Sequence, residues 1–208
     1  MIDCTHGDGL WTLTLNRPEK ANSLTAEMLA WMVDLVMEAS VDPHLRGLII
    51  TGAGDKVFSA GADLDQARAG LATSPLWEDV SGAIAALPCL TIAALNGTLA
   101  GGAFGMALAC DLRIAVPDAR FFYPVAKLGF LPQPSDPGRL VALMGPARAK
   151  LLLLGGQKFT AEEALGFGLI DRIVPGKALM DAARDIAADA LAGNPDVLHK
   201  IKVMCAPR

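Results

Sequence analysis

The spacing of hydrophobic positions predicts strands and helices in alternation. Apolar and polar residues alternate in LWTLTLN, from Leu10 to Asn16, which is the pattern of a half-buried strand. From Leu29 onward apolar residues recur at helical spacing, which predicts a helix with Thr25 as its N-cap and Met28 as its third residue. A short apolar strand that ends in a glycine turn is predicted next, in RGLIITGAG.

The middle of the chain continues in the same way, and its last third is mostly helical. A helix is predicted around Leu76–Leu87, followed by the strand LTIAAL, a turn at Asn96–Gly97, a glycine-rich helix and the strand DLRIAV. Beyond Gly138 several helices follow one another, with LIDRIV as one brief strand and a last short helix after Pro195. Alternating strands and helices predict an α/β fold with a buried sheet.

The length of the chain, 208 residues, fits one domain with a sizeable core. We expect a single domain over residues 1–208, with a core over about 1–137 and a mainly helical region over about 138–208. The formal net charge is −4 at pH 7, and Lys and Arg are interspersed along the chain. Because no broad basic surface is expected, nucleic acid is not an expected partner.

A membrane span has to be weighed, because mean hydropathy is +0.39 and no charged residue occurs from Ser81 to Cys110. Pro88 and the turn at Asn96–Gly97 divide this stretch, so we expect buried core and no association with a membrane. The N-terminal segment MIDCTHGDGLW has neither the basic nor the apolar region of a secretion signal. The expected location is the cytoplasm.

The cysteines and histidines are scattered and form no motif. No CxxC pair or metal-ligand spacing occurs, so no zinc site, other metal site or histidine-based catalytic triad is expected. The cysteines are expected to be buried thiols in a reducing compartment. The residues concerned are Cys4, Cys89, Cys110 and Cys205, and His6, His44 and His199.

Two glycine-containing segments stand out, FSAGADL (Phe58–Leu64) and LAGGAFG (Leu99–Gly105). Each follows a predicted strand, and the second opens a helix whose unpaired N–H groups suit an anion. The order of the glycines does not give GxGxxG, and no GKS or GKT occurs, so a dinucleotide or phosphate loop is not supported. Taken alone, the glycines are equally well explained by close packing of a helix on a strand.

Four motifs, in this order, resemble the enoyl-CoA hydratase/isomerase (crotonase) family: NRPEKANSLT, FSAGADL, NGTLAGGAFGMALACDLRIA and FFYPVAKLGFLP. GQKFTAEEALGFGLIDRIVP is also similar, so the likeness extends from about Leu10 to Pro195. The resemblance implies a crotonase-like spiral of ββα units, of the ClpP/crotonase type, with a short helical C-terminal region. It also implies a homotrimer or a hexamer, made looser here because the chain stops at Arg208 and looks truncated beside the family.

The resemblance further implies that the substrate is an acyl-CoA. The thioester carbonyl would bind in an oxyanion hole made by the backbone N–H groups of Ala62 and Gly102, and loss of one such donor typically costs about 10²–10³ in rate. Coenzyme A is then part of the substrate, and no separate cofactor is expected. The implied substrate-binding residues are Ala60, Ala62, Asp63, Leu64, Asp65, Gly101 and Gly102. Considered without the resemblance, Asp63 is expected to stabilise a turn.

The two glutamates of the family's hydratases are missing. Hydration commonly uses two carboxylates, and motif spacing places them at Gly105 and Val125, neither of which transfers a proton. No glutamate occurs between Glu78 and Glu162. Four aspartates lie in that span: Asp79, Asp111, Asp118 and Asp136.

Asp136 and Tyr123 are the candidates for proton transfer. Some members of the family draw a catalytic acid from the neighbourhood of Asp136, but its pattern is better explained as a helix N-cap, with Pro137 as the first helical residue. Tyr123 is a potential donor of a hydrogen bond or a proton, or a half-buried aromatic residue on a strand. The remaining acids are expected to be structural (Asp111), in a surface turn (Asp118) or solvated (Glu78, Asp79).

Three functions stay open. The favoured one is an acyl-CoA enzyme that stabilises a thioester enolate without the usual glutamates, through decarboxylation, isomerisation or thioester cleavage. The second is a non-catalytic acyl-CoA-binding protein on the same scaffold. The third is an ordinary enoyl-CoA hydratase of fatty-acid metabolism. The acyl group is not identified, because apolar pocket residues are interchangeable at the level of sequence.

Overall fold

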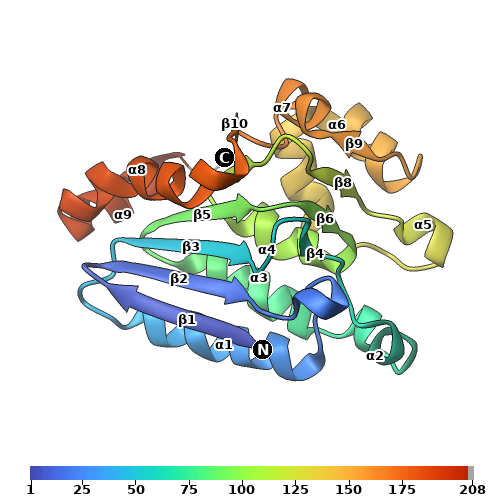
Figure 1. The fold of residues 1–208 in the computed structure, drawn as a ribbon, viewed down its shortest axis with the longest axis horizontal. Coiled ribbons are helices and arrows are strands. Elements are labelled where there is room, and N and C mark those ends of the chain that lie inside the picture. The colour runs from blue at the N-terminus through green and yellow to red at the C-terminus, as the bar shows by residue number, and fades with distance from the viewer. Residues whose placement is uncertain (206–208) are drawn as a thin grey trace.

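A computed structural model describes residues 1–205, and its strands form two sheets (Figure 1). The larger sheet of this region has six strands, in the order β1-β2-β3-β5-β7-β10. Its pairs are parallel, except that β1 is antiparallel to β2. The strands are β1 (Ile2–Gly7), β2 (Leu10–Leu15), β3 (Gly47–Gly52), β5 (Leu90–Leu95), β7 (Leu112–Ala115) and β10 (Arg172–Ile173).

The second sheet of the described region has the order β4-β6-β8-β9. Its strands are β4 (Val57–Ser59), β6 (Thr98–Ala100), β8 (Arg120–Phe122) and β9 (Phe159–Thr160). Strand β3 is followed by β4, β5 by β6 and β7 by β8, so consecutive strands go to different sheets before a helix returns the chain. This repetition is the spiral of ββα units expected from the sequence, which confirms the fold class.

Helices cover both faces of the larger sheet (Figure 1). Helix α1 packs on α3, and α3 on α4, whereas α8 packs against β3, β5 and β7. The helices are α1 (Ala26–Ser40), α2 (Leu64–Arg68), α3 (Leu76–Ala86), α4 (Phe104–Ala109), α5 (Val125–Leu128), α6 (Asp136–Leu153), α7 (Ala161–Phe167), α8 (Leu179–Ala192) and α9 (Pro195–Cys205). Every residue of α4 is buried. Within residues 1–205, no helix is long and apolar enough to cross a membrane.

The N-terminal elements form as the sequence predicts. The Thr25 hydroxyl accepts a hydrogen bond from the Met28 N–H over 3.1 Å, which is the predicted cap of α1. The glycine-rich run differs, because Thr98–Ala100 is strand β6 and helical structure begins only at Gly101. A side chain at Gly97 would overlap the Lys56 carbonyl, so the chain lies directly against the segment leading into β4 and continues beside it as a strand.

The cysteines are only partly as expected. Cys89 and Cys110 are buried, and burial raises the pKa of both thiols to about 12, so they are unreactive at neutral pH. Cys4 is half-buried and Cys205 is exposed, so the expectation of buried thiols was wrong for Cys205.

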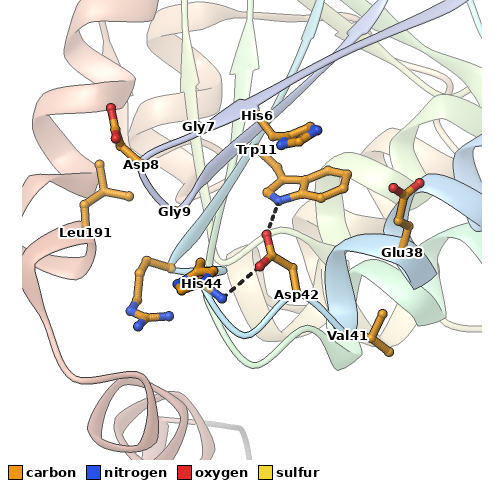
Figure 2. Close-up of a pocket in the computed structure, with 11 residues that line it drawn as sticks. His6, Gly7, Asp8, Gly9, Trp11, Glu38, Val41, Asp42, His44 and Leu191 are labelled. Atoms are coloured by element: carbon orange, nitrogen blue, oxygen red, sulfur yellow. Dashed lines mark hydrogen bonds between the residues drawn. The ribbon is translucent and has the colours of Figure 1, made fainter.

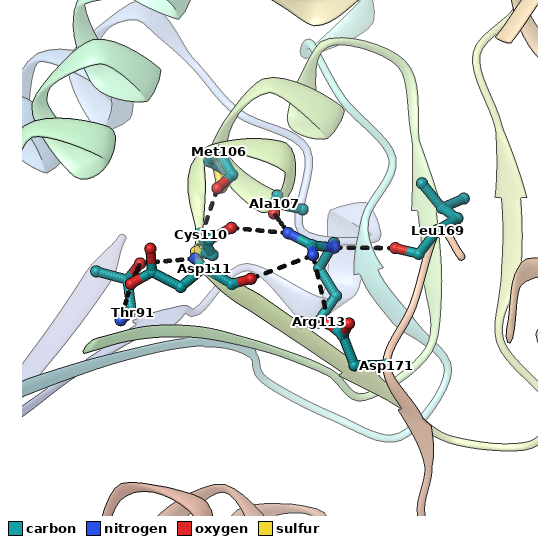
Figure 3. Close-up of polar contacts among 8 residues, drawn as sticks. All are labelled: Thr91, Met106, Ala107, Cys110, Asp111, Arg113, Leu169 and Asp171. Atoms are coloured by element: carbon teal, nitrogen blue, oxygen red, sulfur yellow. Dashed lines mark hydrogen bonds and ion pairs between the residues drawn. The ribbon is translucent and has the colours of Figure 1, made fainter. Parts of the chain in front are cut away.

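Arg113 joins the end of α4 to the segment before β10 (Figure 3). Its guanidinium, which is only 4% exposed, donates hydrogen bonds to the carbonyls of Cys110 (2.7 Å) and Leu169 (2.9 Å) and forms an ion pair with Asp171 (3.3 Å). Beside it, the Asp111 carboxylate accepts hydrogen bonds from the N–H and hydroxyl of Thr91, as expected of a structural residue. These contacts hold the C-terminal end of the central helix.

Replacing Arg113 by Met should reduce the free energy of unfolding by about 3–5 kcal/mol, because buried carbonyls lose their donors and Asp171 loses its partner. Urea-induced unfolding measures this loss. Arg184→Met is the matched control, because Arg184 forms an exposed ion pair with Asp181 and should change stability by less than about 1 kcal/mol. Equal effects of the two substitutions would contradict the assignment.

Candidate active site

The two glycine segments lie against each other. Strands β4 and β6 pair in parallel, and Gly61, just after β4, has a φ of 87°, a conformation that favours glycine. A β-carbon at Gly61 would lie 2.9 Å from the Ala100 oxygen and 3.2 Å from the Gly102 nitrogen. Backbone therefore approaches backbone here, and a side chain at Gly61 would separate the two segments.

Ala62 lines the pocket, and its N–H is turned away from Leu24. On one edge of this segment, Leu24 N–H donates to the Gly61 carbonyl and Asp63 N–H donates to the Leu24 carbonyl, both over 2.8 Å. This is the pattern of a parallel bridge centred on Ala62, in which the N–H of the central residue points to the opposite edge. Ala62 itself is one of the residues that line the pocket.

The N–H of Gly102 belongs to the same pocket. Gly102 lies in the 3-10 turn Gly101–Ala103 that leads into α4, and the first N–H groups of such a segment have no partner within it. The indole of Trp77, from α3, packs over Gly102, because a β-carbon there would lie 3.2 Å from its ring. Two backbone donors, from Ala62 and Gly102, therefore border one largely apolar pocket of about 160 Å³.

Most of the expected substrate-binding residues line this pocket, namely Ala60, Ala62, Leu64, Gly101 and Gly102. Asp63 and Asp65 do not. The Asp63 carboxylate caps α2 and forms an ion pair with Arg17 over 2.7 Å, which agrees with a turn-stabilising role. The Asp65 carboxylate is 94% exposed and lies beside Arg68.

A carboxyl group lies beside the glycine that replaces the first missing acid. Gly105 is buried in α4, and Val125, the second position, is buried at the start of α5 and lines the pocket. Oδ1 of Asp136 lies only 3.4 Å from the place that a β-carbon of Gly105 would take. A carboxyl group from α6 therefore lies close to the position in α4 at which the acid is missing.

The interpretation of Asp136 as a helix cap was wrong. Ser135 is the N-cap residue of α6, Asp136 is the first helical residue, and no side chain caps the helix. Because the Asp136 side chain is directed into the interior, its Oδ2 accepts a hydrogen bond from the Tyr123 hydroxyl over 2.9 Å. Its Oδ1 is buried without a hydrogen-bond partner among the described residues.

Tyr123 connects this carboxyl to the pocket. It lies just after β8 and is fully buried, rather than half-buried on a strand as expected. Its ring stacks on Phe104 with centroids 5.2 Å apart, and it lines the pocket, whereas Asp136 does not. The structure thus brings together the two proton-transfer candidates, which the sequence left unconnected.

Burial is the main influence on the pKa values of the Asp136 carboxyl and the Tyr123 hydroxyl. Loss of solvation raises the pKa of the Asp136 carboxyl to about 7, against the hydrogen bond from Tyr123 and the charge of Arg139, which lower it. The pKa of the Tyr123 hydroxyl is also raised, first by burial and then by Asp136. Near neutral pH the carboxyl of Asp136 therefore occurs both with and without its proton, whereas the Tyr123 hydroxyl keeps its proton.

Two further residues were missed by the sequence analysis. Gln133 lines the pocket, donates from Nε2 to the Gly102 carbonyl over 2.9 Å, and donates from its backbone N–H to the Tyr123 oxygen over 3.5 Å. Glu78 was expected to be solvated, but its carboxylate accepts hydrogen bonds from the hydroxyl and the N–H of Ser135. Neither residue belongs to a motif, so only the folded chain reveals its place.

A second pocket lies at the turn between β1 and β2 (Figure 2). Figure 2 shows His6 stacked on Trp11, whose indole N–H donates to Asp42 over 2.9 Å, with His44 nearby. The bond from Trp11, and then that from the His44 N–H, lower the pKa of Asp42, so this carboxylate is held in structural contacts. Within residues 1–205, no group of three or more His, Cys, Asp or Glu is placed to hold a metal ion.

The fold and the site together define an α/β domain in which the backbone of Ala62 and of Gly102 borders an apolar pocket. A family model described as enoyl-CoA hydratase/isomerase matches residues 5–206, and the chain belongs to this family of acyl-CoA enzymes.

Individual relatives agree with this assignment. The chain is 38% identical over 196 residues to the putative enoyl-CoA hydratase/isomerase YngF of Bacillus subtilis, covering 91% of this chain and 75% of YngF. It is 39% identical, with coverage of 91% and 74%, to carnitinyl-CoA dehydratase of Citrobacter koseri. Among solved structures, a putative enoyl-CoA hydratase/carnithine racemase from Magnetospirillum magneticum superimposes with a TM-score of 0.92 at 30% identity, over all of this chain and 82% of that one.

The raised pKa of Asp136 predicts a specific pH dependence of stability. Its native carboxyl holds its proton up to about pH 7, whereas an unfolded aspartate loses it near pH 4, so ionisation destabilises the fold as pH rises through this window. Relative to Asp136→Asn, the unmodified protein should lose stability between pH 4 and 7, on the order of a few kcal/mol. Urea unfolding at several pH values measures the difference.

The control is Asp63→Asn, because asparagine is also a good N-cap. The hydrogen bond from Arg17 lowers the pKa of Asp63, so its stabilising effect is present above about pH 4 and is lost as pH falls. The two variants should therefore differ from the unmodified protein with opposite pH dependence. A parallel pH dependence of Asp136→Asn and the unmodified protein would disprove the assignment to Asp136.

Proposed function

We propose that this member of the enoyl-CoA hydratase/isomerase family stabilises the enolate of an acyl-CoA thioester and moves the α-proton through Tyr123 to Asp136. The thioester oxygen binds to the N–H groups of Ala62 and Gly102. The observation that carries the proposal is the buried 2.9 Å hydrogen bond from Tyr123 to Asp136, next to the glycine that replaces the usual acid. It supplies a proton-transfer group at a site that otherwise has none.

The proton moves as a relay in the proposed reaction. The ionised form of Asp136 starts the reaction. Asp136 does not line the pocket, so Tyr123 is the group that faces the substrate. As the α C–H bond breaks, its proton passes to the Tyr123 oxygen while Tyr123 passes its own proton to Asp136 Oδ2. The two transfers occur together, because the raised pKa of Tyr123 disfavours a free tyrosinate.

The electrons of the broken C–H bond stay on the thioester. They form an enolate whose oxygen carries the negative charge between the two backbone donors, the type of interaction that contributes most in a site shielded from water. Once the Tyr123 hydroxyl, which lines the pocket, has exchanged its proton with water, return of a proton to the same carbon replaces the α-hydrogen by one from solvent. Delivery of the proton to a different carbon of an unsaturated acyl chain gives isomerisation. Every proton is accounted for without a second acid.

Hydration is expected to be slow. It needs a base for water in addition to an acid for the α-carbon, and a positioned acid or base contributes about 10²–10⁴ in rate. Gly105 and Val125 supply neither. Decarboxylation or isomerisation, which require fewer proton transfers, fit the site better.

Deuterium exchange tests the proposal. Butyryl-CoA incubated with the protein in D₂O should gain deuterium at its α-carbon, as measured by mass spectrometry. Tyr123→Phe and Asp136→Asn should each reduce the exchange rate by about 10²–10⁴ while butyryl-CoA still binds, because the backbone donors remain. Asp118→Asn, in an exposed turn, is the control and should exchange at the unmodified rate.

The alternatives give different results. Binding of butyryl-CoA without exchange above the buffer rate would identify a non-catalytic binding protein. Hydration of crotonyl-CoA as fast as α-proton exchange would identify an ordinary hydratase and contradict the proposal.

We further infer, from family membership, assembly as a homotrimer or a hexamer made of two trimers. Multi-angle light scattering at micromolar concentration should give a mass of three or six times the 21.7 kDa chain, and a monomer would disprove it. From family membership we also propose a cytoplasmic location and a role in fatty-acid metabolism.

A further inference from the structure

Gln133 lies at the centre of the site, although no motif contains it. It is the residue that contacts both parts of the proposed machinery, through its Nε2 bond to the Gly102 carbonyl (2.9 Å) and its backbone bond to the Tyr123 oxygen (3.5 Å). It also lines the pocket. Replacing its side chain therefore removes the bond to Gly102 and leaves the backbone bond to Tyr123 in place.

The Gln133 amide fills the space beside Gly105. A β-carbon built on Gly105 would overlap Oε1 of Gln133 and lie 3.2 Å from its carboxamide carbon. Glycine at position 105 and glutamine at position 133 are thus sterically paired. A larger residue at position 105 requires the Gln133 amide to move, and this movement breaks its bond to Gly102.

Two buried acceptors meet at this place. Oε1 of Gln133 and Oδ1 of Asp136 both lie within 3.4 Å of the point that the Gly105 β-carbon would occupy, and neither has a hydrogen-bond partner among the described residues. Asp136 is fully buried. The Gln133 amide and the Asp136 carboxyl group therefore lie close together beside Gly105.

We propose that Gln133 determines reaction specificity: its amide takes the place of an acid at position 105, holds Gly102, and keeps water away from Asp136. The inference rests on the proposed function, because it concerns what the same site excludes. It means that the site carries out one proton transfer and rejects hydration through the shape of a neutral side chain. It also means that restoring glutamate at position 105 alone cannot restore a hydratase.

The experiment compares two rates in each variant, hydration of crotonyl-CoA and α-deuterium exchange of butyryl-CoA. Their ratio of kcat/KM values measures specificity. Gln133→Ala should raise the ratio at least about 10-fold, because water gains access to Asp136, whereas loss of the bond to Gly102 slows both reactions and leaves their ratio unchanged. Gln157→Ala is the matched control, since Gln157 is exposed, and should leave both rates unchanged.

Two variants test the steric pairing directly. Gly105→Glu alone should give no gain in hydration, whereas Gly105→Glu combined with Gln133→Ala should gain about 10²-fold over the unmodified protein, since it has both space and a second acid. Thermal unfolding of each variant confirms that it folds. If Gly105→Glu gains as much as the double variant, or if Gln133→Ala leaves the ratio unchanged, Gln133 does not determine specificity.

The two proposals fail in different ways. Absence of exchange in the unmodified protein overturns the proposed function, whatever the variants do. A gain in hydration that requires the removal of Gln133 supports the steric pairing of positions 105 and 133 even in that case, because the pairing depends only on the space beside Gly105.

Discussion

The close approach of Gly61 to the Gly101–Gly102 backbone is the contact on which the site depends. It brings the segment after β4 against the start of the central helix, so that the N–H groups of Ala62 and Gly102 border one pocket. No side chain takes part in this contact. Its geometry is set by the parallel pairing of β4 with β6 and by glycines that permit backbone to pack on backbone.

The rest of the fold holds the central helix in the position that this contact requires. Helix α4 is buried along its whole length, which explains why the surrounding stretch of sequence carries no charge. Its C-terminal end is held by Arg113, which satisfies carbonyls that a helix end leaves unpaired. At its N-terminal end, Gln133 and Trp77 pack over Gly102. The helix is therefore fixed at both ends.

The sequence predicts interactions between residues that are near one another along the chain better than contacts between residues that are far apart along it. The Thr25 cap and the strands of the larger sheet follow from local spacing, and the ordered motifs predict the fold and the residues around the pocket. The contact of Tyr123 with Asp136 was not predictable, because the residues around Asp136 also fit a local cap. Gln133 was missed because its importance depends on the empty space beside Gly105, which exists only in the folded chain.

The replacement of a second acid by a neutral amide changes the electrostatics of the site. Two neighbouring carboxylates repel each other, so one of them holds its proton at a raised pKa. At the Gly105 position the neighbour of Asp136 is the neutral Gln133 amide. Burial is the main cause that raises the pKa of Asp136 to about 7, and the charge of Glu78 adds to it. A pKa near the working pH allows a group both to accept and to return a proton. In the proposed reaction, one such carboxyl, relayed by Tyr123 and shielded by Gln133, would move a proton within a substrate rather than add water to it.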